Sequence, residues 1–227
     1  MMKGVTRVHR VKQLASAVVV GSVLFSAGFG VSLAQDSTVS EVDLSPNPDQ
    51  CNQAPRAIEE IEALQDAGIP SSSAATIATD DFELPAGDEA PPEVRGGIVE
   101  TIVQIIACAN GGDQLASFGG VTDDMFTMLA GASVFSIEAV TSLPASPVAL
   151  PEDSQTELLD TREFTVFDDD RVGVLVYYRV PTDQASDPDA VQIALWTFAQ
   201  EDGRWLLDEM VTGLEAQLGD MATPPAG

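Results

Sequence analysis

Apolar residues recur at helical spacing at the start of the long central part of the chain. In the stretch 93–110, EVRGGIVETIVQIIACAN, isoleucines stand at positions 98, 102, 105 and 106, so one face is apolar. This spacing predicts a helix that ends at Gly111 and Gly112, where the pattern stops. Two shorter helices are expected directly afterwards, at Asp113–Phe118 and Thr122–Leu129, with Thr122 capping the second one.

The hydrophobic period changes to two in the C-terminal half, which indicates β-strands. Four strands are predicted, at Glu163–Phe167, Arg171–Val180, Val191–Gln200 and Arg204–Val211. The turn before the last strand contains Asp202-Gly203 between two apolar runs, which is a strong hairpin signal. Helices followed by a meander of antiparallel strands argue for an α+β fold, with N-terminal helices packed on the sheet.

The folded domain is expected to span residues 93–218, with a disordered tail at 219–227. Residues 35–92, rich in acidic residues and proline, are expected to form a flexible arm. Within this arm, proline at the start of PRAIEEIEALQDAG, glycine at its end and an apolar face predict a short helix at 55–67. Residues 141–156 are interrupted by prolines and are expected to be a loop.

The first residues have the three parts of a secretory signal. Four basic residues precede an apolar stretch at 14–33, and small residues then precede Ala34-Gln35. We therefore expect a signal peptide at 1–34, cleaved between Ala34 and Gln35, and a secreted protein. The alternative is that residues 14–33 stay as a membrane anchor, because their length could just span a bilayer. Only in that case is a membrane partner expected.

Removal of the first 34 of the 227 residues leaves six arginines, no lysine and all 36 acidic residues, a net charge of −30. A field of this sign repels phosphate, so no nucleic-acid partner is expected. The acidic residues are explained by solubility in a secreted domain. Asp168–Asp170 and Asp123-Asp124 are the best candidates for a cation site, but both lack the spaced ligands of a calcium loop, so no metal site is predicted.

The two cysteines, Cys51 and Cys108, allow one internal pairing. Outside the cytoplasm an even count of cysteines is typical of a disulfide. Metal binding would need more ligands, and no histidine remains to supply them. We therefore predict a disulfide between Cys51 and Cys108, which would dock the short helix of the arm beside the long helix.

Three segments carry a resemblance to a known family. They are the end of the long helix in Ala-Asn-Gly-Gly-Asp, the following Thr-Asp-Asp-Met-Phe, and the closing hairpin Trp196–Met210. Together, over roughly residues 93–213, they resemble the nuclear-transport-factor-2-like superfamily, which includes SnoaL-like and ketosteroid-isomerase-like folds. The chain also looks like secreted members whose arm carries a cysteine paired with the long helix. The resemblance implies a cone-shaped α+β barrel, in which a curved sheet folded against helices encloses an apolar pocket. It also implies a possible homodimer through the open sheet face, but no single activity.

Most catalytic chemistry is excluded by composition. His9 is the only histidine and lies in the segment expected to be removed, and the mature chain has no lysine. Triads built on histidine, imidazole metal ligands and Schiff bases are therefore ruled out. No glycine-rich phosphate loop or other cofactor signature is present, so no cofactor is expected.

Carboxylate chemistry survives these exclusions, because an acid in an apolar pocket can serve as a general base beside a tyrosine. Strand alternation places Tyr178 on the inner face, and it places Glu209 on one face with Trp205. Tyr178 and Glu209 could therefore share the pocket. The alternative is that Tyr178 is a rim or core aromatic and Glu209 a solvated residue. Trp196 and Trp205 could stack on a ligand, although most tryptophans in a small sheet fill the core.

The sequence thus favours an exported domain without catalytic activity that binds a small apolar ligand or a protein partner. The near-empty catalytic inventory and the expected apolar pocket are the reasons. The alternative is a small-molecule isomerase, dehydratase or hydrolase that depends on carboxylates. The pocket candidates are Tyr178, Trp196, Trp205 and Glu209.

Overall fold

The computed structural model describes residues 46–67, 76–77, 82–131, 135–142, 146–180 and 190–218. All of these residues belong to the unit Glu41–Gly227. The expected signal segment, its cleavage site at Ala34-Gln35 and the expected tail at 219–227 lie outside the described residues. The cleavage site therefore stays a prediction.

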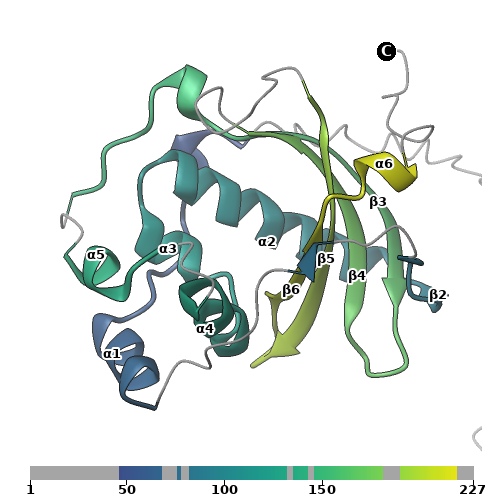
Figure 1. The fold of residues 1–227 in the computed structure, drawn as a ribbon, viewed down its shortest axis with the longest axis horizontal. Helices are drawn as coiled ribbons and strands as arrows, with labels where there is room; N and C mark the ends of the chain where they lie inside the picture. Colours follow the sequence, from purple (N-terminus) through teal and green to yellow (C-terminus); the bar gives the residue numbers. More distant parts are fainter. Residues whose placement is uncertain are drawn as a thin grey trace, which may run out of the picture. The chain divides into compact units, whose positions relative to one another are not determined.

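Four long strands form an antiparallel meander at the C-terminal end of the chain (Figure 1). They are β3 (Glu157–Val166), β4 (Val172–Arg179), β5 (Gln192–Glu201) and β6 (Arg204–Thr212). Two short strands complete the sheet in the order β1-β6-β5-β4-β3-β2. Strand β2 (Asp88–Glu89) pairs antiparallel with β3, and β1 (Thr76–Ile77) pairs parallel with β6. Strands β2 to β6 therefore make a five-strand antiparallel sheet, which confirms the α+β fold class.

The sheet is neither closed nor strongly curled, so it does not form the cone-shaped α+β barrel that was expected. Strands β1 and β2 form its two opposite edges and do not pair with each other. Closure of a barrel requires tilted edge strands long enough to pair along their length. Here each edge strand has two residues, too few to carry that pairing.

Helices cover one face of the sheet (Figure 1). The long helix α2 (Pro92–Asn110) packs against β3 and β6 and is followed by the shorter helices α3 (Gln114–Phe118), α4 (Asp123–Gly131) and α5 (Ile137–Thr141). Even-numbered residues of β4 face these helices, as the alternation predicted. The main core lies between the two layers and contains, among others, Ile98, Ile102, Phe126, Val174, Val176 and Phe198.

The opposite face of the sheet is covered by the chain itself. Leu175, Ile193 and Leu214 have no exposed surface and form a second core. Phe82 from the arm and Leu218 of α6 (Glu215–Leu218) pack against it. A homodimer through this face stays a prediction, and it would have to displace these two side chains.

The boundaries of two predicted elements change. Helix α1 (Ile58–Ala67) begins three residues after Pro55, and Ile61 is its one fully buried side chain. Strand β3 begins at Glu157, six residues before the predicted start, because it pairs with β4 along its whole length from Glu157 opposite Arg179. Two register shifts in that pairing interrupt the alternation from which the strand was predicted. The expected loop at 141–156 contains a short 3-10 helix, Glu152–Ser154.

Candidate functional site

Tyr178 of β4 and Trp196 of β5 lie on the helix-facing side of the sheet and contact each other. Their ring centroids are 6.4 Å apart and the rings meet edge to face. Phe198 follows on the same strand, with its centroid 6.4 Å from that of Trp196. Two of the four predicted pocket residues are thus brought together, at the border of the main core.

The ring of Trp196 carries a hydrogen-bond donor into this apolar region, and the partly buried ring of Tyr178 carries a second donor beside it. The indole N–H of Trp196 is buried and, within the described part of the chain, has no hydrogen-bond partner. Burial raises the pKa of Tyr178 to about 12, with a further contribution from the negative charge of Glu215. The phenol therefore keeps its proton, and its capacity to donate, at physiological pH.

Glu209 does not share this face with Tyr178. The pairing of β5 with β6 shifts by one residue, so that Thr197 lies opposite Glu209 while Phe198 lies opposite Leu207. Residues directly opposite each other share a face of the sheet. Met210, opposite Trp196, therefore packs on the main core in the place that alternation assigned to Glu209. A bulge at Asp208 causes this change.

Glu209 instead belongs to an ion-pair cluster with Arg171. The guanidinium of Arg171 donates to Asp208 at 3.1 Å and to Glu209 at 3.3 Å. The other carboxylate oxygen of Asp208 accepts a hydrogen bond from the hydroxyl of Thr122, which also caps α4 by accepting from the N–H of Met125. This cluster fixes the middle of β6 to the start of α4, and both carboxylates are already paired.

Trp205, the remaining pocket candidate, lies in a cavity of its own. Its indole packs partly on the main core and lines a cavity of about 310 Å³ between α2, residues 52–54 of the arm and the β5–β6 hairpin. Gly97 of α2 makes this position possible, because a side-chain carbon there would lie 3.0 Å from Trp205 Cδ1. The carbonyl of Trp205 accepts a hydrogen bond from Thr101 at 2.9 Å. We call this cavity, with Glu100, Arg204, Asn52 and Gln53 among its lining residues, the Trp205 cleft.

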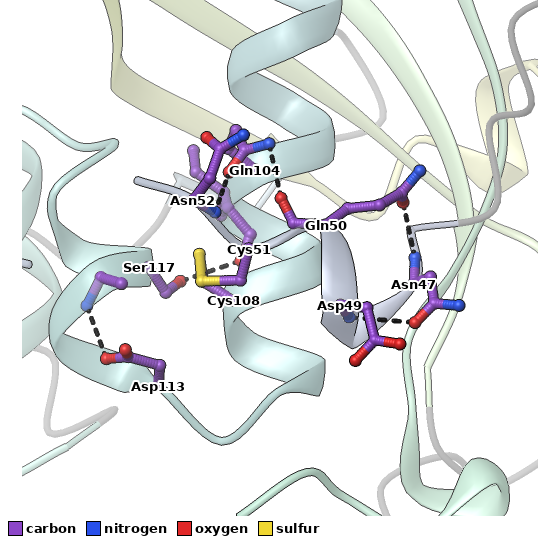
Figure 2. Close-up of a disulfide and its surroundings, with 11 residues drawn as sticks. Asn47, Asp49, Gln50, Cys51, Asn52, Gln104, Cys108, Asp113 and Ser117 are labelled. Atoms are coloured by element: carbon purple, nitrogen blue, oxygen red, sulfur yellow. Dashed lines mark hydrogen bonds between the residues drawn. A yellow bond between two sulfur atoms is a disulfide. The ribbon is translucent and has the colours of Figure 1, made fainter. Parts of the chain in front are cut away.

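Residues 52–54 of the arm, which line one side of the cleft, are held in place by the predicted disulfide next to them. Cys51 and Cys108 are bonded, with their Cα atoms 4.7 Å apart (Figure 2). Beside the bond, the side chain of Gln104 accepts from the N–H of Asn52 and donates to the carbonyl of Gln50 (Figure 2). A disulfide is typical of an oxidising setting outside the cytoplasm. No helix in the described ranges is long and apolar enough to cross a membrane.

Arg56 fastens the next part of the arm. Its side chain is 8% exposed, donates to the carbonyls of Phe118 and Val121, and pairs with Asp123. It also lies over the ring of Phe126, 5.1 Å from the centroid. The sequence showed no sign of this role, because the contacts of Arg56 lie more than 60 residues away along the chain.

Asp123 and Asp169, from the two acidic runs considered as cation sites, pair with arginines. Among the described residues, no three acidic, cysteine or histidine side chains are grouped so that they could hold a metal ion.

Comparison of the chain with models of protein families, with curated proteins and with solved structures finds no match. The fold and the site define an α+β protein with an aromatic pair, Tyr178 and Trp196, on the helix-facing side of an antiparallel sheet.

Proposed function

We propose that this chain is an exported, non-catalytic member of the nuclear-transport-factor-2-like superfamily that binds a small apolar ligand. The ligand would lie between helices and sheet, against Tyr178 and Trp196. The order of elements supports this proposal, with helices followed by an antiparallel sheet. The disulfide from the arm to α2 supports it as well, because the resemblance to secreted members of that group implies a cysteine of the arm paired with the long helix.

The observation that carries the proposal is the unpartnered indole N–H of Trp196. A buried donor without an acceptor costs about 1–3 kcal/mol. A ligand with a carbonyl or ether oxygen would supply that acceptor and recover the cost. The neighbouring phenol of Tyr178 offers a second donor to the same ligand. An apolar body with one or two acceptors is therefore the ligand that this region favours.

Carboxylate catalysis, the alternative reading, would need a base beside Tyr178. Glu209 lies on the face of the sheet away from Tyr178 and pairs with Arg171. Glu215 accepts a hydrogen bond of 2.8 Å from the backbone N–H of Ile193. Both carboxylates therefore have partners that hold them as structural acceptors. Binding without turnover is the function that this arrangement supports better.

Thermal-shift titration with steroid ketones, polyketides, fatty acids and terpenes tests the proposal. A ligand that binds only the folded protein raises Tm with its concentration. The variant Trp196→Phe keeps most of the apolar surface but removes the donor, so the shift should be lost. Trp205→Phe serves as the matched control and should keep the shift, and it leaves Trp196 as the sole fluorescent reporter.

Three outcomes would overturn the proposal. The first is that no ligand of the panel changes Tm or the Trp196 emission. The second is that Trp196→Phe keeps the full shift, which would place the ligand elsewhere. The third is turnover of a bound ligand that is lost in Glu209→Gln, which would establish the catalytic alternative.

A further inference from the structure

The Trp205 cleft contains two opposite charges that do not pair with each other. Arg204 comes from the β5–β6 hairpin and Glu100 from α2, and both residues line the cavity. Both residues are exposed, and neither forms a salt bridge within the described residues. The cavity thus presents a free guanidinium on one wall and a free carboxylate on another.

The free guanidinium is unusual in this chain. The other five arginines beyond residue 34 all form ion pairs with carboxylates, namely Arg56, Arg95, Arg162, Arg171 and Arg179. The chain has 36 acidic residues, so partners for an arginine are abundant. Arg204 therefore stays available for an external anion, and arginine matches a carboxylate with two parallel hydrogen bonds.

The electrostatics of the whole chain select against a simple anion. A net charge of −26 repels negative ligands and attracts positive ones. A zwitterion carries no net charge, so this field neither repels nor attracts it. Its carboxylate would match Arg204 and its ammonium would match Glu100.

The remaining walls suit the body of such a ligand. The indole of Trp205 offers an apolar surface, and the polar residues Asn52 and Gln53 also line the cavity. The volume of about 310 Å³ lies at the lower end of the range for ligand sites, roughly 300–1,000 Å³. A cavity of this size takes an amino acid or a dipeptide.

We propose that the Trp205 cleft binds a small zwitterion, an amino acid or a dipeptide, between Arg204 and Glu100. This site is separate from the region around Tyr178 and Trp196. The two proposals can therefore fail independently. Trp196→Phe removes the donor of the first site and leaves the walls of the cleft unchanged.

Calorimetric titration of the oxidised protein with the dipeptide Ala-Phe tests this proposal. The N-acetylated dipeptide lacks the ammonium, and the C-amidated dipeptide lacks the free carboxylate. Each blocked form should bind about tenfold or more weakly, because each loses a charge-assisted hydrogen bond. Free phenylalanine is a second probe of the same chemistry.

Two charge variants assign each end of the ligand. Arg204→Gln should bind the free and the C-amidated dipeptide equally but still discriminate against the N-acetylated form. Glu100→Gln should show the reverse pattern. Arg95→Gln and Glu59→Gln, which change the same charges outside the cleft, should behave as the parent protein does.

Three results would overturn the proposal. Either neither zwitterionic probe binds, or both blocked dipeptides bind as tightly as the free one. Binding that survives both Arg204→Gln and Glu100→Gln would equally overturn it, because the ligand would then lie elsewhere. Melting temperatures of all variants verify that each one folds.

Discussion

Tyr178 shows how one partly buried residue joins stability to the binding region. Its phenol lies against Trp196 on the helix-facing side of the sheet, where water has little access. Desolvation penalises the phenolate, so the folded state holds the proton of Tyr178 more tightly than the unfolded chain does. At physiological pH the phenol is protonated, so a hydrogen-bond donor lies beside the unpartnered indole N–H.

This difference in pKa predicts a loss of stability at high pH. The pKa of Tyr178 is about 12 in the folded protein, compared with about 10 in an unfolded chain. Because the unfolded chain loses this proton first, the contribution of Tyr178 is present below pH 10 and is lost as the pH rises through 12. The free energy of unfolding should fall by up to about 3 kcal/mol across this window.

Urea unfolding at several pH values, together with tyrosinate absorbance, measures the effect. Tyr178→Phe should remove most of the loss. Burial also raises the pKa of Tyr177, so the difference between the two proteins isolates Tyr178. Equal pH dependence in the parent and in Tyr178→Phe would contradict the prediction.

Among the strands, the face on which a residue lies could be predicted from the sequence where side chains alternate regularly, and could not be predicted where a bulge interrupts the alternation. Strand β4 has no bulge against β5, and its even-numbered face was predicted correctly from period two. Strand β6 has a bulge at Asp208, which has no residue opposite it on β5. Glu209 therefore lies on the other face from the one that strict alternation along the sequence assigns to it. In β3, Glu163 adopts a φ of 54° within the second of two register shifts, and these shifts interrupt the alternation from which the strand was predicted. A bulge is set by the pairing of two strands and leaves no mark in either one alone.

The Trp205 cleft could not be predicted for a related reason. Its walls come from the arm, from α2 and from the last hairpin, so Glu100 and Arg204 are brought together only by the fold. The pairing of Cys51 with Cys108 was predicted, because a chain with two cysteines allows one pairing. Trp196 and Trp205 both pack against the main core, as most tryptophans in a small sheet do.

Two adjacent glycines of α2 give a matched test of how the cleft is built. At Gly96 an added side-chain carbon would meet nothing within 4 Å, so Gly96→Ala should stabilise the helix by about 1 kcal/mol. At Gly97 the same carbon would lie 3.0 Å from Trp205 Cδ1, which forces the indole to move. Gly97→Ala should therefore gain less or lose stability, and it should shift the Trp205 emission in a Trp196→Phe background.

The emission of Trp205 in Gly96→Ala should remain unchanged, which controls for the helix itself. Chemical unfolding of both variants gives the difference in stability. If Gly97→Ala were as stable as Gly96→Ala and left the emission unchanged, the indole would not rest on α2 as described.

At the scale of the whole molecule, covalent and polar links hold the arm to the domain. The disulfide joins the arm to α2, the side chain of Gln104 bridges Gln50 and Asn52, and Arg56 reaches α3 and α4. Among the described residues of the arm few apolar side chains are buried, and Ile61 is the one of α1 that has no exposed surface. The arm therefore depends on these links more than on hydrophobic burial.

Reduction of the disulfide should destabilise the whole domain and free the arm first. The bond closes a loop with a sequence separation of 57 residues, for which chain entropy gives about 4 kcal/mol of stabilisation. The double variant Cys51→Ser, Cys108→Ser should lower the free energy of unfolding by a similar amount. Limited proteolysis should then cut the arm before the sheet, because α2 and the meander keep their own core.

The Trp205 cleft should be lost in the same variant, since Asn52 and Gln53 form its wall next to Cys51. Dipeptide binding should therefore disappear, while the thermal shift from an apolar ligand at Trp196 should persist at a lower Tm. Non-reducing peptide mapping of the parent should show a linked pair of Cys51 and Cys108 peptides and no free thiol. An arm that resists protease after reduction would show that Gln104 and Arg56 hold it without the covalent bond.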